Sequence, residues 1–141
     1  MIRKIIISFF IFLTFLSCEK PAPVFDSQRA FLDLVAQCDF GPRNPGSEGH
    51  RKTKKYILDL MHKEADSVIV QDFLFESALE KKTHNGTNII ARFNPFNATQ
   101  VLIGAHWDTR PFADRDENRE NFKTPILGAN DGASGVAILI E

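Results

Sequence analysis

Apolar residues recur every three or four positions in two segments, and this spacing predicts two amphipathic helices. The first helix is expected to begin after a cap at Asp26 or Ser27 and to bury one stripe of residues, Phe31, Leu34, Val35 and Cys38. The second is expected to begin at Ser47, a good capping residue, and to bury another stripe, Thr53, Ile57, Leu60 and Met61. The loop between them, 39–46, is stiffened by prolines and glycines.

The pattern then changes to one typical of strands. A run of β-branched residues at 68–70 predicts a strand at 67–75. A polar turn and two further strands are expected after it, the turn at 80–86 and the strands at 88–93 and 101–105. An irregular charged loop at 107–127 leads to a last helix from Asp131 or Gly132 onward. This order predicts an α/β fold with a partly antiparallel sheet.

The last helix is apolar all round, as for a helix packed on a sheet, and no capping residue closes it. We therefore expect the domain at 26–141 to be truncated. The second predicted helix carries His50 and His62, which lie twelve positions apart and so do not share a metal site. Both are interpreted as surface or interface histidines.

Composition describes a globular protein. The chain has 141 residues, enough for one ordinary domain, with 43% hydrophobic and 25% charged residues. The net charge is −1 and no basic stripe occurs, so nucleic acid is not expected as a partner.

The N-terminus resembles a bacterial lipoprotein signal. Residues 1–17 combine two basic residues with an apolar stretch too short to span a bilayer, and Cys18 follows directly. Lipid on Cys18, with 18–25 as a spacer, would anchor the protein to a membrane of the cell envelope, in the periplasm or on the outer surface. The alternative is an ordinary signal peptide with a chance cysteine. The other cysteine, Cys38, is expected to be a buried structural thiol.

Two short motifs carry the candidate chemistry. His106 stands at the end of the strand expected at 101–105, and Asp108 lies on the same side of an extended segment. Asp131 stands in a glycine-rich turn at the start of the last helix. Imidazole and carboxylate are ligands that catalytic zinc favours. A hydrogen-bonded histidine and a helix-capping aspartate are the structural alternatives, although the combination is more specific than either part.

Four blocks of sequence resemble the zinc-dependent exopeptidase-like family, and within it the bacterial glutaminyl-peptide cyclotransferases: FGPRNPGS (40–47), GTNIIA (86–91), HWDTRP (106–111) and GANDGASG (128–135). The resemblance implies a mixed, mainly parallel twisted sheet with helices on both faces, of which this chain holds about the N-terminal half. It also implies that Asp131 is a zinc ligand and that His106 either binds zinc or lies beside it. From its position two residues after His106, Asp108 is expected either to orient the imidazole or to hold a second metal. The family's catalytic glutamate is expected beyond Glu141.

The implied reaction is the zinc-dependent cyclisation of an N-terminal glutamine of a peptide or protein to pyroglutamate, with release of ammonia. The alternatives are a two-zinc aminopeptidase of the same fold, in which His106 and Asp131 both bind metal, and a lipoprotein fragment without catalytic activity. The Asn130-Asp131-Gly132 sequence argues mildly against the aminopeptidase, which more often carries Asp-Asp-Asn there.

Overall fold

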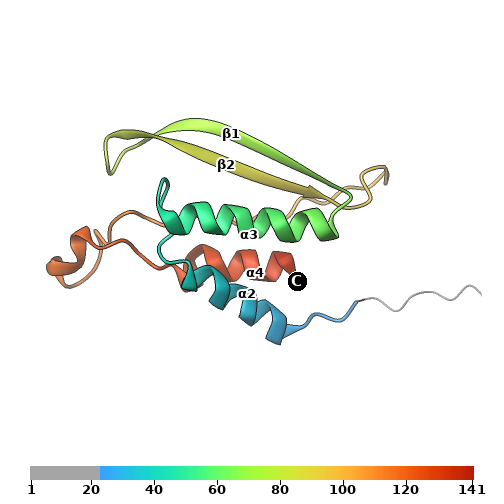
Figure 1. Ribbon diagram of the computed structural model, residues 1–141, viewed down its shortest axis with the longest axis horizontal. Helices are drawn as coiled ribbons and strands as arrows, with labels where there is room; N and C mark the ends of the chain where they lie inside the picture. Colours follow the sequence, from blue (N-terminus) through green and yellow to red (C-terminus); the bar gives the residue numbers. More distant parts are fainter. Residues whose placement is uncertain (1–22) are drawn as a thin grey trace, which may run out of the picture.

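A computed structural model describes residues 23–141 as a β-hairpin packed on three helices (Figure 1). In Figure 1 the hairpin lies over α3, and α2 and α4 lie side by side beneath α3. The elements, in chain order, are α2 (Ser27–Asp39), α3 (Glu48–Glu64), β1 (Ser67–Ser77), β2 (Lys82–Arg92), a 3-10 turn (Arg119–Lys123) and α4 (Ser134–Ile140).

Helix α2 begins where the sequence predicts, but it buries a different side. The Asp26 carboxylate caps it by accepting hydrogen bonds from the first-turn main chain. The buried residues are Ala30, Asp33 and Gln37, whereas Phe31 of the predicted stripe is 59% exposed. The prediction is wrong because polar contacts determine which face of α2 is buried. Asp33 accepts a hydrogen bond from Tyr56, and Gln37 donates a hydrogen bond to the turn before α4.

The rest of the predicted α2 stripe, including Cys38, is only partly buried. Cys38 is a free thiol, so the prediction of a buried cysteine is corrected to a half-buried one.

Helix α3 follows its prediction more closely. Ser47 caps it by accepting from the His50 main-chain N–H at 3.0 Å, and its inner face buries Thr53, Ile57 and Met61. His62 is exposed, as expected. Of the two positions expected for His50, at the surface or in an interface, the surface one is wrong, because the residue is only 8% exposed. Trp107 covers it, a contact between distant parts of the chain.

The hairpin is antiparallel, with Ser67 opposite Arg92 at one end and Ser77 opposite Lys82 at the other. The expected turn at 80–86 is wrong, since the turn occupies only 78–81 and β2 begins at Lys82. Pairing with β1 satisfies the main-chain groups of these polar residues, so they form strand despite their low propensity.

The α/β class is confirmed, and the sheet is small, with two strands in the described residues. The strand expected at 101–105 does not form there: the segment has no ladder, and Leu102 is 92% exposed. A strand needs a neighbour to bond its main-chain groups, and the part of the chain that the structure describes places none beside this segment.

The core lies between α3 and α4. Ile57, Met61 and Val136 form its centre, and partly buried residues of the hairpin and Trp107 pack around them. The other side of α4 is apolar but open, with Ile138 60% exposed. Among residues 23–141, α4 is therefore covered on the side that carries Val136 and uncovered on the side that carries Ile138.

The predicted signal at 1–17 and the lipid site at Cys18 lie outside the described residues. Within residues 23–141, no helix is both long and apolar enough to cross a membrane.

Candidate metal centre

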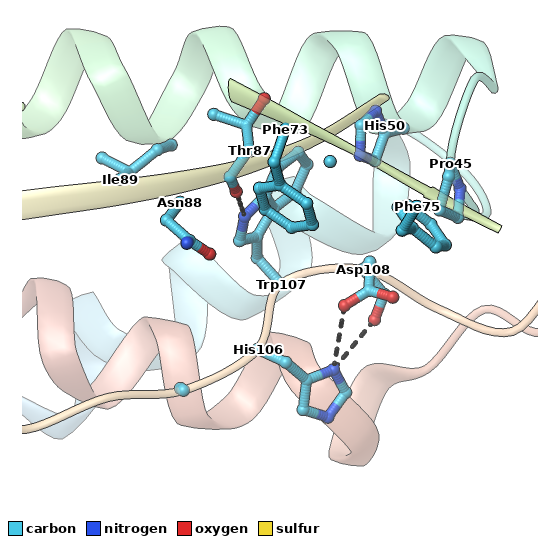
Figure 2. Close-up of a pocket in the computed structure, with 12 residues that line it drawn as sticks. Pro45, His50, Phe73, Phe75, Thr87, Asn88, Ile89, His106, Trp107 and Asp108 are labelled. Carbon is cyan, nitrogen blue, oxygen red and sulfur yellow. Dashed lines mark hydrogen bonds and ion pairs between the residues drawn. The ribbon is translucent and has the colours of Figure 1, made fainter. Parts of the chain in front are cut away.

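The structure brings together the three residues that the sequence singles out. His106 Nε2 lies 2.9 Å from Asp131 Oδ1. On the other side of the ring, His106 Nδ1 lies 3.1 Å from the main-chain oxygen of Asp108 and 3.5 Å from its Oδ1 (Figure 2). An imidazole and two carboxylates from segments more than twenty residues apart thus form one cluster.

Trp107 fixes the direction in which His106 and Asp108 point. Its indole N–H donates to the Thr87 main-chain oxygen at 3.1 Å, and its ring stacks on His50 with centroids 4.3 Å apart (Figure 2). Because side chains alternate along an extended segment, holding Trp107 against α3 and the hairpin places His106 and Asp108 on the opposite side of the segment from Trp107. Burial lowers the pKa of His50 below its ordinary value, which keeps this stacked ring neutral near pH 7.

Glycines shape the turn that presents Asp131. Gly128 is left-handed, with φ 64° and ψ 43°, and Gly132 has φ 98°. A Cβ on Gly132 would also lie 3.1 Å from His106 Cε1, so a side chain there would press on the histidine ring. Helix α4 begins only at Ser134, slightly later than predicted, because Asp131 and Gly132 have non-helical backbone angles.

Arg43 connects the two segments of the cluster, a role that the sequence analysis missed. Its side chain is 0% exposed and donates to three main-chain oxygens: Trp107 at 3.1 Å, Leu127 at 2.8 Å and Gly128 at 2.7 Å. Its main-chain N–H also donates to Thr109 Oγ1 at 2.9 Å. No local pattern marks a bond to residues more than sixty positions away, so only its place in the PRNP loop could have drawn attention to it.

The donor set suits a zinc ion. A carbonyl oxygen only accepts, so a hydrogen bond to Asp108 requires the tautomer in which His106 Nδ1 carries the proton. In the neutral ring, Nε2 then presents a lone pair to the Asp131 carboxylate at 2.9 Å, and two acceptors this close repel unless a proton or a cation lies between them. The side chains of His106 and Asp131 are 54% and 75% exposed, so an ion can reach them.

The set is also incomplete: within residues 23–141, no three or more His, Cys, Asp or Glu side chains are arranged so that together they could hold a metal ion. A structural zinc site uses four ligands and a catalytic one uses three. His106 and Asp131 could therefore hold a metal only together with ligands that are not among the side chains grouped with them here.

A cavity of about 490 Å³ lies beside the cluster (Figure 2). Its walls are largely apolar and include Phe73, Phe75 and Trp107, and His106 and Asp108 lie at its edge. The arrangement offers an apolar wall next to the candidate ligand His106.

Glu141 has a different role. Its carboxylate accepts from the Asp26 main-chain N–H at 2.9 Å and from the Arg29 guanidinium, which joins the end of α4 to the start of α2. The bond from Arg29 lowers the pKa of Glu141. The carboxylate is thus committed to a structural ion pair.

Comparison with known proteins identifies the relatives of this chain. Residues 88–141 match Peptidase family M28. The whole chain is 30% identical over 155 residues to the protein YfbL of Escherichia coli (strain K12), covering 99% of this chain and 44% of that protein.

Three solved structures match 84% of this chain and 40% of their own. They are a leucine aminopeptidase precursor from Bacteroides thetaiotaomicron VPI-5482 (39% identity, TM-score 0.78), the glutaminyl cyclase of Tannerella forsythia (36%, 0.80) and a Zn-dependent exopeptidase from Parabacteroides distasonis ATCC 8503 (33%, 0.80). This chain therefore spans less than half the length of each of these proteins.

The resemblance expected from the four motifs is confirmed by these matches. The HWDTRP and GANDGASG blocks both fall within the segment that matches Peptidase family M28. The chain is similar in sequence and fold to part of a zinc-dependent exopeptidase and of bacterial glutaminyl cyclases.

Proposed function

We propose that this chain contributes to the zinc centre of a glutaminyl cyclase, which converts the N-terminal glutamine of peptides or proteins to pyroglutamate and releases ammonia. One observation carries the proposal. His106 Nε2 and Asp131 Oδ1 converge to 2.9 Å at the solvent-accessible end of a glycine-rich turn. The relatives named as cyclases and as a zinc-dependent exopeptidase support the metal and the reaction class.

In this proposal Asp131 binds the metal directly, and His106 binds it or lies beside it. Bound zinc would polarise the side-chain amide carbonyl of the substrate as a Lewis acid. The Asp108 main-chain oxygen holds the His106 ring by accepting a hydrogen bond from Nδ1–H, which keeps the Nε2 lone pair directed at the site. The resemblance assigns proton transfer from the attacking amine to a general base beyond Glu141.

The walls of the cavity would favour cyclisation through orientation. The attacking amine and the amide carbonyl belong to the same glutamine, so the reaction needs a folded side chain more than a second substrate. Phe73 and Trp107 form an apolar wall beside His106, and such a wall would limit the conformations of the bound residue and exclude water.

An aminopeptidase is the second candidate, because the leucine aminopeptidase precursor matches this chain as well as the cyclase does. In that reading two metals would activate a water, with His106 and Asp131 both as ligands. Zinc stoichiometry separates the two readings: a cyclase is expected to bind one ion and an aminopeptidase two. A protein without catalytic activity, the third reading, is expected to bind no zinc ion.

The experiment uses the full-length protein that carries this chain. It is offered a peptide with N-terminal glutamine and one with N-terminal leucine, and products are identified by mass spectrometry. We expect loss of ammonia from the first peptide and no change in the second. Asp131→Ala is expected to abolish zinc binding and turnover, whereas the exposed Asp59→Ala, matched in chemistry, leaves both unchanged. Release of free leucine would instead establish the aminopeptidase.

We also propose that Cys18 is lipidated and that the protein is held at a membrane of the cell envelope. The support is the sequence at 1–18, a short apolar segment with basic residues that ends directly before a cysteine.

A further inference from the structure

Two buried polar side chains hold the two ends of the turn that presents Asp131. Arg43 Nη2 donates to the main-chain oxygen of Gly128, where the turn begins, at 2.7 Å. Gln37 Nε2 donates to the main-chain oxygen of Ala133, where the turn ends, at 3.2 Å. Both donors are 0% exposed. The turn is therefore attached at both ends to the end of α2 and the loop that follows it.

The same guanidinium also holds the segment that carries the histidine. Arg43 Nε donates to the main-chain oxygen of Trp107, the residue between His106 and Asp108, at 3.1 Å. The main chains of the two segments bond as well, since the Thr109 main-chain N–H donates to the Arg43 oxygen at 3.3 Å. Arg43 thus lies between the two halves of the candidate metal centre and bonds to both.

The chemistry of arginine suits this position better than that of any other side chain. The guanidinium is planar and presents five N–H donors in fixed directions, so it can bond three oxygens from two segments at once. Among residues 23–141, Arg43 forms no ion pair with a carboxylate. Burial lowers the pKa of Arg43. The nearby Cys38 and the carboxylates of Asp108 and Asp131 act in the opposite direction and raise this pKa.

The side chains of the two candidate ligands are not packed into the protein. The side chains of His106 and Asp131 are more than half exposed, so packing around them does not fix their positions. Their separation depends on the main chain beneath them. Gly128 packs directly on this support, since a Cβ there would lie 3.2 Å from Arg43 Nη2.

We infer that Arg43, assisted by Gln37, is a positioning residue that sets the separation of His106 and Asp131 before a metal binds. The consequence for metal affinity rests on the proposed function, whereas the ordering of the two segments does not. Loss of the Arg43 bonds would let the two ligands move apart. Part of the free energy of zinc binding would then be used to bring them together, so the affinity for zinc would fall.

The test compares Arg43→Met, Arg43→Lys and Gln37→Met in the full-length protein, with Arg51→Met as a control because Arg51 is an exposed arginine of α3. Three properties are measured: the zinc Kd by chelator competition, the visible spectrum of the cobalt(II)-substituted protein, and hydrogen exchange of segments 106–109 and 127–133 without metal. Circular dichroism and the Tm report on folding.

We expect Arg43→Met to fold, to exchange faster in both segments and to raise the zinc Kd by about 10- to 100-fold. Its cobalt spectrum should change, because the ligand geometry changes. Arg43→Lys should recover part of the affinity, since an ammonium bonds carbonyl oxygens without the planar fork. Gln37→Met should raise the Kd by about 2- to 10-fold, as for one lost hydrogen bond.

A purely structural Arg43 would give a lower Tm with unchanged zinc Kd, cobalt spectrum and local exchange, and this result would overturn the inference. If Arg43→Met does not fold, Gln37→Met decides: unchanged exchange at 127–133 would overturn it. A wild-type protein that binds no zinc would refute the proposed function, and the exchange measurement would still decide whether Arg43 orders the two segments.

Discussion

At the scale of single residues, the unexpected features are polar groups that the fold buries. Gln37, Arg43 and His50 are all nearly inaccessible, although polar residues of these types are mostly found at protein surfaces. Each has a distant partner: the end of the Asp131 turn, the oxygens around the cluster, and the Trp107 ring. The burial of His50 also makes stability depend on pH.

Stability is expected to fall as the pH drops from 7.5 to 5.5, and His50→Phe should reduce that fall. Burial lowers the pKa of His50 in the folded state below the ordinary 6.5, so the unfolded chain binds more protons in this range. The His50 contribution is therefore present above about pH 6.5 and is lost as the pH falls through the folded pKa. Phenylalanine keeps the stack on Trp107 but does not titrate.

The measurement is the free energy of unfolding in urea at both pH values. His62→Phe is the control, because His62 is exposed on the same helix. Equal pH dependence in wild type and His50→Phe would contradict the argument. The carboxylates of Asp72 and Glu141, whose pKa values are lowered, titrate below this range and do not interfere.

At the scale of elements, the hairpin depends on a cross-strand pair in which one partner has no side chain. Phe73 lies opposite Gly86 in the register, and its ring occupies the space that a Cβ on Gly86 would need. Glycine is disfavoured in strands, so this position reflects the close approach of the ring rather than a preference of the backbone.

Gly86→Ala is expected to lower the free energy of unfolding by about 1–3 kcal/mol, because the Phe73 ring must move away from a methyl group. Gly104→Ala is the matched control, since a Cβ there meets no atom within 4 Å, and its effect should stay within about 0.5 kcal/mol. Urea unfolding of the two variants compares them directly. An effect at Gly104 as large as that at Gly86 would show that close packing is not the cause.

At the scale of the whole molecule, the described residues leave apolar surface open beside the hairpin and on α4. Val101, Leu102 and Ile103 are 81%, 92% and 69% exposed in an extended segment without a strand partner. Such a segment combines apolar side chains with unpaired main-chain groups, which is the combination that promotes pairing with another chain.

A protein that consists of residues 23–141 is therefore expected to self-associate as its concentration rises. Leu102→Lys should reduce the association, because a charge on an exposed strand opposes pairing. Phe96→Lys should have little effect, since Phe96 is fully exposed but lies in a turn. Sedimentation velocity over a concentration series measures both. A monomer at all concentrations would refute the prediction.

A second prediction at this scale concerns the membrane. Wild-type protein expressed in a bacterial host should fractionate with membranes, and Cys18→Ser should move to the soluble fraction, because lipid on this cysteine would be the anchor. Cys38→Ser is the control, since Cys38 lies within the folded part. Identical fractionation of wild type and Cys18→Ser would exclude lipid attachment there.

The sequence by itself determined the local features of this protein. Asp26 and Ser47 cap their helices as predicted, the inner face of α3 follows the apolar spacing, and β1 follows its β-branched run. These depend on contacts within a few residues, which local patterns describe. The motifs also identified His106, Asp108 and Asp131, which the fold brings together, although their role in binding metal stays a prediction.

Only the tertiary structure decided which surfaces are buried and what holds the cluster. The face of α2 was misjudged because Gln37 and Asp33 are chosen by distant polar partners, and β2 is longer than predicted because pairing outweighs propensity. The segment at 101–105 shows the opposite effect, since an apolar run forms no strand where no neighbour bonds it. The role of Arg43 could not be assigned from a local pattern, because its hydrogen-bond partners lie 64, 84 and 85 positions further along the chain.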